Sequence, residues 1–142
     1  MSRFLRFLLF LVPFSLSFAL SPHDLDKSVN EVKKELHLTE WNVIARSLST
    51  HDMQVTQGCK CYGESMIFPE TKVDVVTILD DEAYKDMGWT DVEQIHAHQR
   101  FVVLHELLHV SVQLTYPDMP HDEQEANVQA TSKMIADEPE KR

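Results

Sequence analysis

Basic residues are scarce in this chain of 142 residues. The 13 lysines and arginines stand against 23 aspartates and glutamates, so the formal net charge at pH 7 is −10. The few basic residues are scattered and form no stripe that could follow a phosphate backbone. This composition argues against nucleic acid and anionic membrane surfaces as partners, and a divalent cation suits it better.

Cysteine is nearly absent, since Cys59 and Cys61 are the two that the chain contains. Two cysteines are too few for a cysteine-rich zinc site, so a metal-binding pair is the less favoured reading. Residues two apart in a strand lie near the upper limit of disulfide reach, and a bridge would need a bend, for which Gly58 and Gly63 are available. Export to an oxidising compartment would favour the bridge, and the sequence alone leaves the pairing open.

Apolar residues form a long run at the amino terminus, over residues 7–20. Two arginines precede the run and small residues lie near its end, which is typical of a secretory signal peptide. We expect residues 1–19 to be a signal peptide cleaved after Ala19 and residues 20–142 to form one domain. An uncleaved membrane anchor is the less favoured alternative, because the run is shorter than the roughly 20 residues of a membrane span. The expected location is secreted or periplasmic, without stable membrane insertion after cleavage.

Hydrophobic periodicity after the signal predicts an α+β fold. An amphipathic helix of about 15 residues should follow Ser21. Residues of high strand propensity occupy three later segments: Trp41–Leu48, a bent or bulged region within Val55–Phe68, and Lys72–Leu79. A loop is expected between the first two, around Thr50 to Gln54. Short connections between successive strands predict a small antiparallel sheet.

Helical patterns fill the rest of the chain. A short acidic helix or turn is expected over residues 80–87. Residues 90–93 read as a capping box in which Thr90 and Glu93 satisfy the first amides of a helix that runs to about Thr115. A last helix should begin at His121 or Asp122 and end near Ala136.

The longer helix contains the pattern His105-Glu106-Leu107-Leu108-His109. Residues four apart in a helix project from the same face, so His105 and His109 can converge on one metal ion with Glu106 beside them. This H-E-x-x-H pattern is typical of zinc sites in which the glutamate acts as general base. A pair of ordinary helix histidines is the alternative interpretation.

A catalytic zinc needs a third protein ligand and an open position. The glycine and histidine that complete this pattern in metzincins are missing, because Val112 and Thr115 stand in their places. The last helix offers carboxylates on its first two turns, and a short proline-bounded turn should pack it beside the motif. Glu125 is the expected third ligand, with Glu123 and His121 as the alternatives.

The choice of Glu125 rests on helix geometry. Glu123 and Glu125 point about 200° apart, so both cannot face the same metal ion. Glu125 shares its face with Val128 and Ser132, whereas Glu123 lies on the more polar side near Lys133. Burial of the less polar face against the motif therefore favours Glu125.

The histidine motif followed by Glu125-Ala126-Asn127 on the next helix resembles the ImmA/IrrE-type metallopeptidases, which are minimal gluzincin domains of bacteria and phages. The resemblance covers residues 72–135. It implies a zincin-like fold in which the small sheet packs against the H-E-x-x-H helix and a carboxyl-terminal ligand helix. It also implies Zn²⁺ as cofactor, with Glu125 as its third ligand.

These features predict an exported zinc-dependent metallopeptidase that acts on a peptide or protein, with Glu106 as the base that moves the proton of the attacking water. The strand over residues 72–79, if it is an edge, could hold an extended peptide. Tyr116 and His121 are candidates for stabilising the oxyanion. A non-catalytic zinc-binding module or a pseudoenzyme is the alternative, and a metal carrier is less favoured because the histidines are dispersed. Cleavage preference and oligomeric state stay open.

Two further histidines lie upstream of the motif on the same helix. His96 and His98 are expected to be solvated, and the alternative for His98 is a role in supporting the site or contacting substrate.

Overall fold

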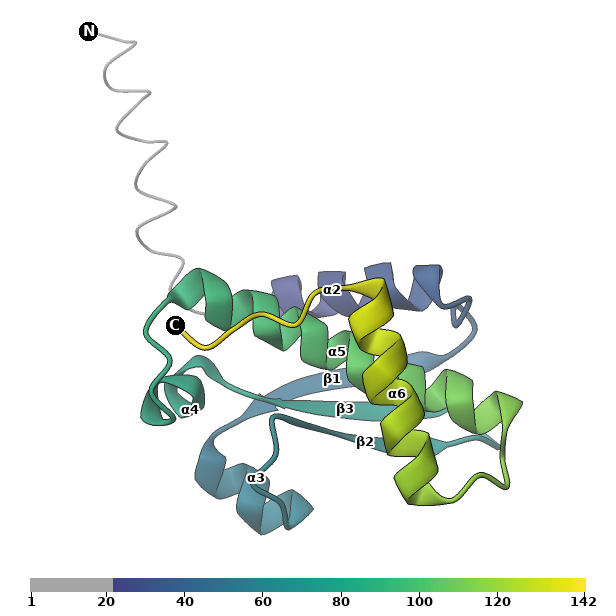
Figure 1. Cartoon of the computed structure of the whole chain (residues 1–142). Helices are drawn as coiled ribbons and strands as arrows, with labels where there is room; N and C mark the ends of the chain where they lie inside the picture. Colours follow the sequence, from purple (N-terminus) through teal and green to yellow (C-terminus); the bar gives the residue numbers. More distant parts are fainter. Residues whose placement is uncertain (1–21) are drawn as a thin grey trace, which may run out of the picture.

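The computed structural model describes residues 22–142, and the expected signal peptide over residues 1–19 lies outside them. The described chain has an α+β fold with five helices and one three-stranded mixed sheet. None of these helices is long and apolar enough to span a membrane. The elements in chain order (Figure 1) are α2 (Pro22–Glu35), β1 (Asn42–Leu48), α3 (Thr50–Gln57), β2 (Gly63–Phe68), β3 (Val73–Leu79), α4 (Asp81–Asp86), α5 (Val92–Thr115) and α6 (His121–Ile135).

The sheet has the strand order β1-β3-β2. Strand β3 runs parallel to β1, with Asn42 beside Val73 and Leu48 beside Leu79, and antiparallel to β2. The expected antiparallel pairing is confirmed for β2 and β3 but wrong for β1, which pairs in parallel with β3 and does not pair with β2 although they follow each other in the chain. The most apolar strand, β3, lies between them and is buried along most of its length, as a central strand should be.

Helix α3 occupies a segment that was expected to be a loop leading into a strand. Its start is capped by Ser49, whose Oγ accepts a hydrogen bond from Asp52 N at 3.1 Å. It ends at Gly58, which has a left-handed φ of 68°. The helix buries a single side chain, Met53. A helix that buries one side chain needs no apolar stripe, so its sequence lacks the pattern that identifies a helix. Residues of high strand propensity such as Val55 led to the incorrect prediction of a strand.

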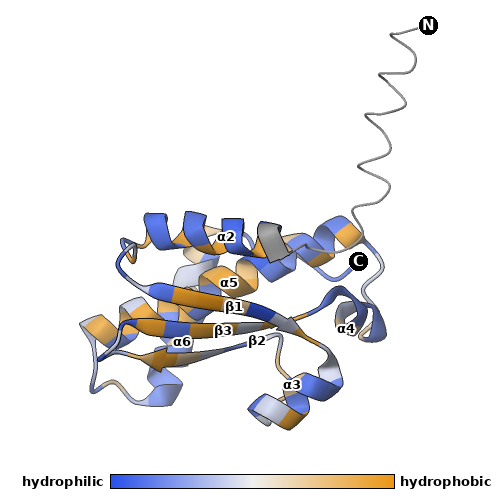
Figure 2. Ribbon diagram, turned by 180° about the vertical axis from the view of Figure 1, so that it is seen from behind, coloured by the Kyte–Doolittle hydropathy of each residue, from blue (hydrophilic) through white to orange (hydrophobic). Residues whose placement is uncertain are grey.

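Helices α2 and α5 cover one face of the sheet (Figure 1). Leu25 and Val29 of α2 pack with Val76 and Ile78 of β3, and the core continues into α5. Viewed from behind, the ribbon of α2 is mostly hydrophilic, as expected for a helix with one buried stripe (Figure 2). The opposite face of the sheet is more open, and Met66 is 46% exposed there.

Helix α5 begins one residue later than the capping-box interpretation required. Asp91 is the N-cap, and its Oδ1 accepts hydrogen bonds from the amides of Glu93 and Gln94 at 3.0 and 3.3 Å. The expected capping role of Thr90 is therefore wrong. Aspartate at this position satisfies two of the first amides and places a negative charge at the positive end of the helix dipole.

Helix α6 packs against α5 after a short turn that contains Pro117 and Pro120. Val128 is fully buried against Leu104 and Leu108 of α5. The helix bounds agree closely with the expected ones. This contact sets which face of α6 meets the histidine motif.

Candidate metal centre

The central feature of the site is a meeting of α5 and α6. His105 and His109 lie one helical turn apart on α5, with their ring centroids 5.2 Å apart. The two carboxylate oxygens of Glu125 on α6 lie 2.9 Å from Nε2 of His105 and 2.9 Å from Nε2 of His109. The three side chains that were expected to share a metal ion are therefore in direct contact.

The alternatives to Glu125 are placed differently. Glu123 is exposed and its side chain takes no part in this group, whose three donor atoms lie within 4.8 Å of one another. His121 also lines the cleft beside the group. Val128 and Ser132, which share the face of Glu125, are both fully buried. Glu125, which lies on the buried face of α6, is therefore the carboxylate that the fold brings to the histidines.

The donor set fits a zinc ion. Ligand atoms about 2.1 Å from a tetrahedral zinc lie roughly 3.4 Å from one another, so the observed separations of 2.9 Å need to widen by only a few tenths of an ångström. Two imidazoles and one carboxylate are also the ligand types of catalytic zinc sites with an open position. The side chain of Glu125 is 49% exposed, which leaves one side of the group accessible from solvent.

Glu106 lies beneath this group and is 7% exposed. Burial raises the pKa of Glu106 to about 8, and the nearby carboxylates of Glu64, Glu125 and Asp74 act in the same direction. Burial likewise lowers the pKa of His109, so its neutral form, which is the one that binds metal, is favoured.

Close approach of β2 to α5 depends on Gly63. A Cβ at this position would collide with Cγ1 of Val102 and would lie 3.3 Å from Oε1 of Glu106. The absence of a side chain therefore lets the strand pass directly over the motif helix.

We expect Gly63→Ala to lower the free energy of unfolding by about 1–3 kcal/mol, because overpacking forces the strand away from α5. Denaturant unfolding measures the effect. The matched double variant Gly63→Ala with Val102→Ala removes the colliding methyl group and should be less destabilised than the sum of the two single variants. Strict additivity would show that this contact does not limit the packing of β2.

A cleft of about 480 Å³ opens over the motif. Its walls come from β2, α5 and α6, and Glu138 closes one part of it from the segment after α6. Phe101 and Val102 supply apolar surface, while Glu106, the two motif histidines and Glu125 supply the polar groups. A concave site with a few convergent polar groups is the usual form of a ligand-binding site.

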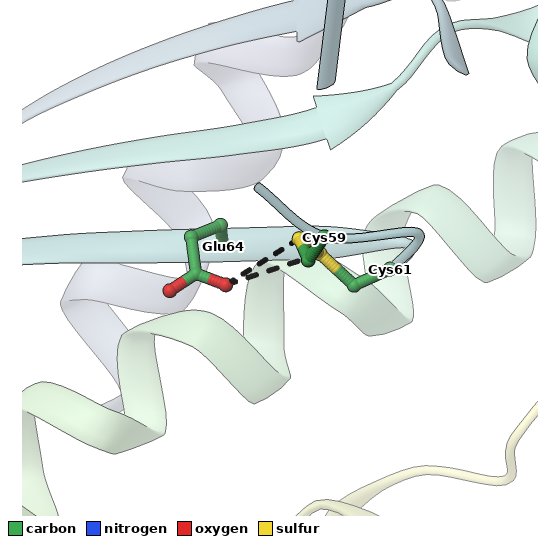
Figure 3. A group of neighbouring side chains, drawn as sticks. All are labelled: Cys59, Cys61 and Glu64. Atoms are coloured by element: carbon green, nitrogen blue, oxygen red, sulfur yellow. Dashed lines mark hydrogen bonds between the residues drawn. A yellow bond between two sulfur atoms is a disulfide. The ribbon is translucent and has the colours of Figure 1, made fainter. Parts of the chain in front are cut away.

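A disulfide joins Cys59 and Cys61 just before β2, with an S–S distance of 2.00 Å and a Cα–Cα distance of 5.4 Å. The bend at Gly58 accompanies it, and the bridged sulfurs are not available as thiolate ligands. Oε2 of Glu64 lies 3.9 Å from each sulfur, and Figure 3 shows the carboxylate pointing toward the bridge. Cys61 and Glu64 both line the cleft.

The expectation that His96 and His98 are solvated is wrong for His98, which is buried, whereas His96 is partly exposed. Nε2 of His96 lies 2.9 Å from Oδ2 of Asp81. His98 is 4% exposed, shares a hydrogen bond of 2.7 Å between its Nδ1 and the hydroxyl of Tyr84, and lines the cleft. Burial lowers the pKa of His98, while the nearby Glu138 opposes the shift. His98 therefore belongs to the wall of the site.

Asp74 is a buried carboxyl next to the cleft wall. One oxygen accepts a hydrogen bond from Ser65 Oγ, and the other has no hydrogen-bond partner among the described residues. Burial raises the pKa of Asp74 to about 6, and the Ser65 hydrogen bond opposes the shift. Because the folded-state value lies above the ordinary one, its contribution to stability is fully present below about pH 4 and is lost as the pH rises through about 6.

We therefore expect Asp74→Asn to be more stable than the parent at pH 8, by up to about 3 kcal/mol, and to show no advantage near pH 4. Urea unfolding at several pH values measures this. Asp26→Asn, at an exposed position on α2, is the matched control and should show no such trend. A parent that is more stable than Asp74→Asn at pH 8 would mean that the ionised carboxylate is paired in solution.

The residues not identified from the sequence are Gly63, Glu64 and Glu138 of the cleft wall, together with Asp74 next to it. Nothing in the local sequence of β2 indicates that it packs against α5. His98 did carry a signal, because it lies seven residues before His105 and so nearly shares its helical face. Comparisons with protein-family models, curated proteins and solved structures found no match for this chain.

Proposed function

We propose that this protein is an exported zinc-dependent metallopeptidase of the gluzincin type, with a zincin-like fold similar to that of the ImmA/IrrE-type enzymes. One observation carries the proposal: the carboxylate of Glu125 on α6 meets Nε2 of both motif histidines at 2.9 Å. Spacing along one helix explains why the histidines are neighbours. The arrival of a carboxylate from a second helix is what a three-ligand catalytic site requires.

Each residue of the site has a role that suits its position. His105, His109 and Glu125 would hold the metal, and Glu125 leaves a solvent-accessible side for water and substrate. Zinc, when bound, supplies the Lewis acidity that makes a water nucleophilic near neutral pH and polarises the scissile carbonyl. Glu106 is buried beside the two histidines, and a bound dication would lower its raised pKa and favour the carboxylate, which can take the proton of the attacking water and pass it to the leaving amine.

The substrate would bind as an extended peptide along β2. The strand over residues 72–79 was expected to have this role if it formed an edge, but β3 is central. Strand β2 is the edge beside the cleft, and its alternate residues Gly63, Ser65 and Ile67 line that cleft. A free edge offers main-chain hydrogen bonds to any extended peptide, whatever its side chains.

Export is supported by two independent features. Residues 1–19 have the composition of a signal peptide. Cys59 and Cys61 form a disulfide, which is the state that an oxidising compartment maintains.

The alternative of a non-catalytic zinc module has less support. A purely structural site is closed by four protein ligands and needs neither a buried Glu106 nor a cleft above it. A metal carrier would need several donor clusters. Within the described residues there is one further grouping of potential ligands, Cys59 with Cys61 and Glu64, and its cysteines are bridged.

The decisive experiment uses the protein expressed from residue 20. We expect one tightly bound zinc per chain by elemental analysis, and cleavage of a peptide library that stops when a chelator removes the metal and returns when zinc is restored. Stoichiometric zinc without cleavage of any peptide would favour the non-catalytic module. Absence of zinc after exposure to the metal would overturn the whole proposal.

A further inference from the structure

We propose that the cleft selects a peptide carrying a lysine or arginine side chain, and that Glu64 is the residue that binds this cationic group. The inference rests on the proposed function to the extent that the cleft is taken as the peptide-binding site. Its support is the charge of the side chains that line the cleft, the absence of a lysine or arginine partner for Glu64 among the described residues, and the position of Glu64 on β2.

The acidic side chains that line the cleft are not balanced there by any lysine or arginine of the described residues. Among the described residues, four glutamates face it, namely Glu64, Glu106, Glu125 and Glu138, and no lysine or arginine does. A concave surface lined by charges of a single sign concentrates its field and attracts ligands of the opposite sign. An acidic peptide would add to the repulsion, whereas a basic one would relieve it.

Three of these glutamates already have a task or a partner. Glu125 contacts the two motif histidines, and Glu106 lies buried beneath them. Glu138 has a lysine beside it, since Nζ of Lys133 lies 3.5 Å from its Oε2. A dication at the histidines would offset the first two carboxylates. Glu64 is the acidic group of the cleft that remains, and the neighbouring group that favours its ionised form is the imidazole of His121 and not a permanent cation.

Glu64 has no lysine or arginine partner in the part of the chain that the structure describes. Its Oε2 faces the Cys59–Cys61 bridge at 3.9 Å from each sulfur, and bridged sulfurs have no proton to donate (Figure 3). The side chain is only partly exposed, so water solvates it incompletely. A carboxylate in this condition gains from a charge-assisted hydrogen bond with a guanidinium or ammonium group.

The position of Glu64 suits a contact with a bound peptide. It follows Gly63, the residue at which β2 passes over Glu106, so it lies on the strand that would pair with an extended substrate. The disulfide holds the chain immediately before this strand. A side chain of the peptide near the scissile bond would therefore come within reach of the Glu64 carboxylate.

The test measures binding to the zinc-loaded Glu106→Gln protein by fluorescence anisotropy at pH 8, where histidine side chains are ordinarily neutral. The probes are labelled octapeptides of alanine and glycine in which each position in turn carries arginine, its uncharged isostere citrulline, or glutamate. We expect arginine to bind about 10- to 100-fold more tightly than citrulline at one position or two neighbouring ones. The peptides that carry glutamate should bind more weakly than those that carry arginine or citrulline.

Variants in the same background assign the effect. Glu64→Gln should abolish the advantage of arginine over citrulline, with the zinc content unchanged. Glu70→Gln, at an exposed position in the turn after β2, is the matched control and should preserve it. An equal affinity for arginine and citrulline, an advantage that survives in Glu64→Gln, or the absence of binding by any of these peptides would each overturn the inference.

The same peptides given to the zinc-loaded parent separate this inference from the proposed function. Charge-selective binding without hydrolysis would refute the peptidase and leave Glu64 as the recognition residue. Hydrolysis without any preference for arginine would support the peptidase and refute the role of Glu64.

Discussion

Zinc-loaded Glu106→Gln is expected to lose hydrolysis, with kcat falling by about 100- to 10,000-fold, while zinc affinity stays close to that of the parent. The amide nearly matches the carboxylate in shape, so the packing of β2 against α5 at Gly63 should survive. It cannot accept the proton of the attacking water, so the chemical step fails while substrate binding remains. Steady-state kinetics and elemental analysis on the same preparation measure both properties.

Glu93→Gln is the matched control for this substitution, because Glu93 lies exposed on the same helix, away from the cleft. It should leave kcat, KM and the zinc content unchanged. If Glu106→Gln hydrolysed peptides at the parental rate, Glu106 would not be the base. The interpretation of the H-E-x-x-H pattern as a catalytic motif would then be wrong.

The meeting of His105, His109 and Glu125 could be predicted because it depends mainly on local geometry. Spacing within α5 puts His105 and His109 on one face, and the burial of Val128 fixes which face of α6 turns toward them. A short turn between two long helices leaves little freedom in how they pack. Glu125 could therefore be distinguished from Glu123 by counting residues around a helix.

The sheet could not be predicted in the same way. Pairing of β1 with β3 joins residues about thirty positions apart, and the strand order depends on which strand can be buried on both sides. Helix α3 adds to the difficulty, since it buries only Met53 and so lacks the periodic pattern that reveals a helix. An error at α3 changes the path of the chain and hence the topology of the sheet.

The residues that form the wall of the cleft could not be predicted from the sequence for a related reason. Glu64 and Gly63 acquire their roles when β2 packs over α5, and neither residue type in a strand indicates such a contact. His98 shows the opposite case. Its place on the α5 face near His105 could be read from the helical period, but its burial depends on Tyr84, which arrives from α4.

The zinc affinity of Glu125→Ala is expected to fall by more than about 100-fold, because even groups that only support a ligand are worth 10- to 100-fold. Glu125 lies on an exposed turn of α6, where alanine is the best helix former, so the fold should persist. Glu123→Ala removes the same charge two residues earlier, from a side chain that does not contact the histidines, and its affinity should match that of the parent. Competition with a chelator of known affinity measures the zinc affinity of both variants, and circular dichroism checks their helix content.

His121→Ala completes the comparison, because His121 also lines the cleft and can donate to a metal. Parental affinity in Glu125→Ala together with a large loss in His121→Ala would assign the third ligand to His121 and remove the gluzincin character of the site. A loss confined to Glu125→Ala would identify α5 and α6 together as the zinc-binding unit.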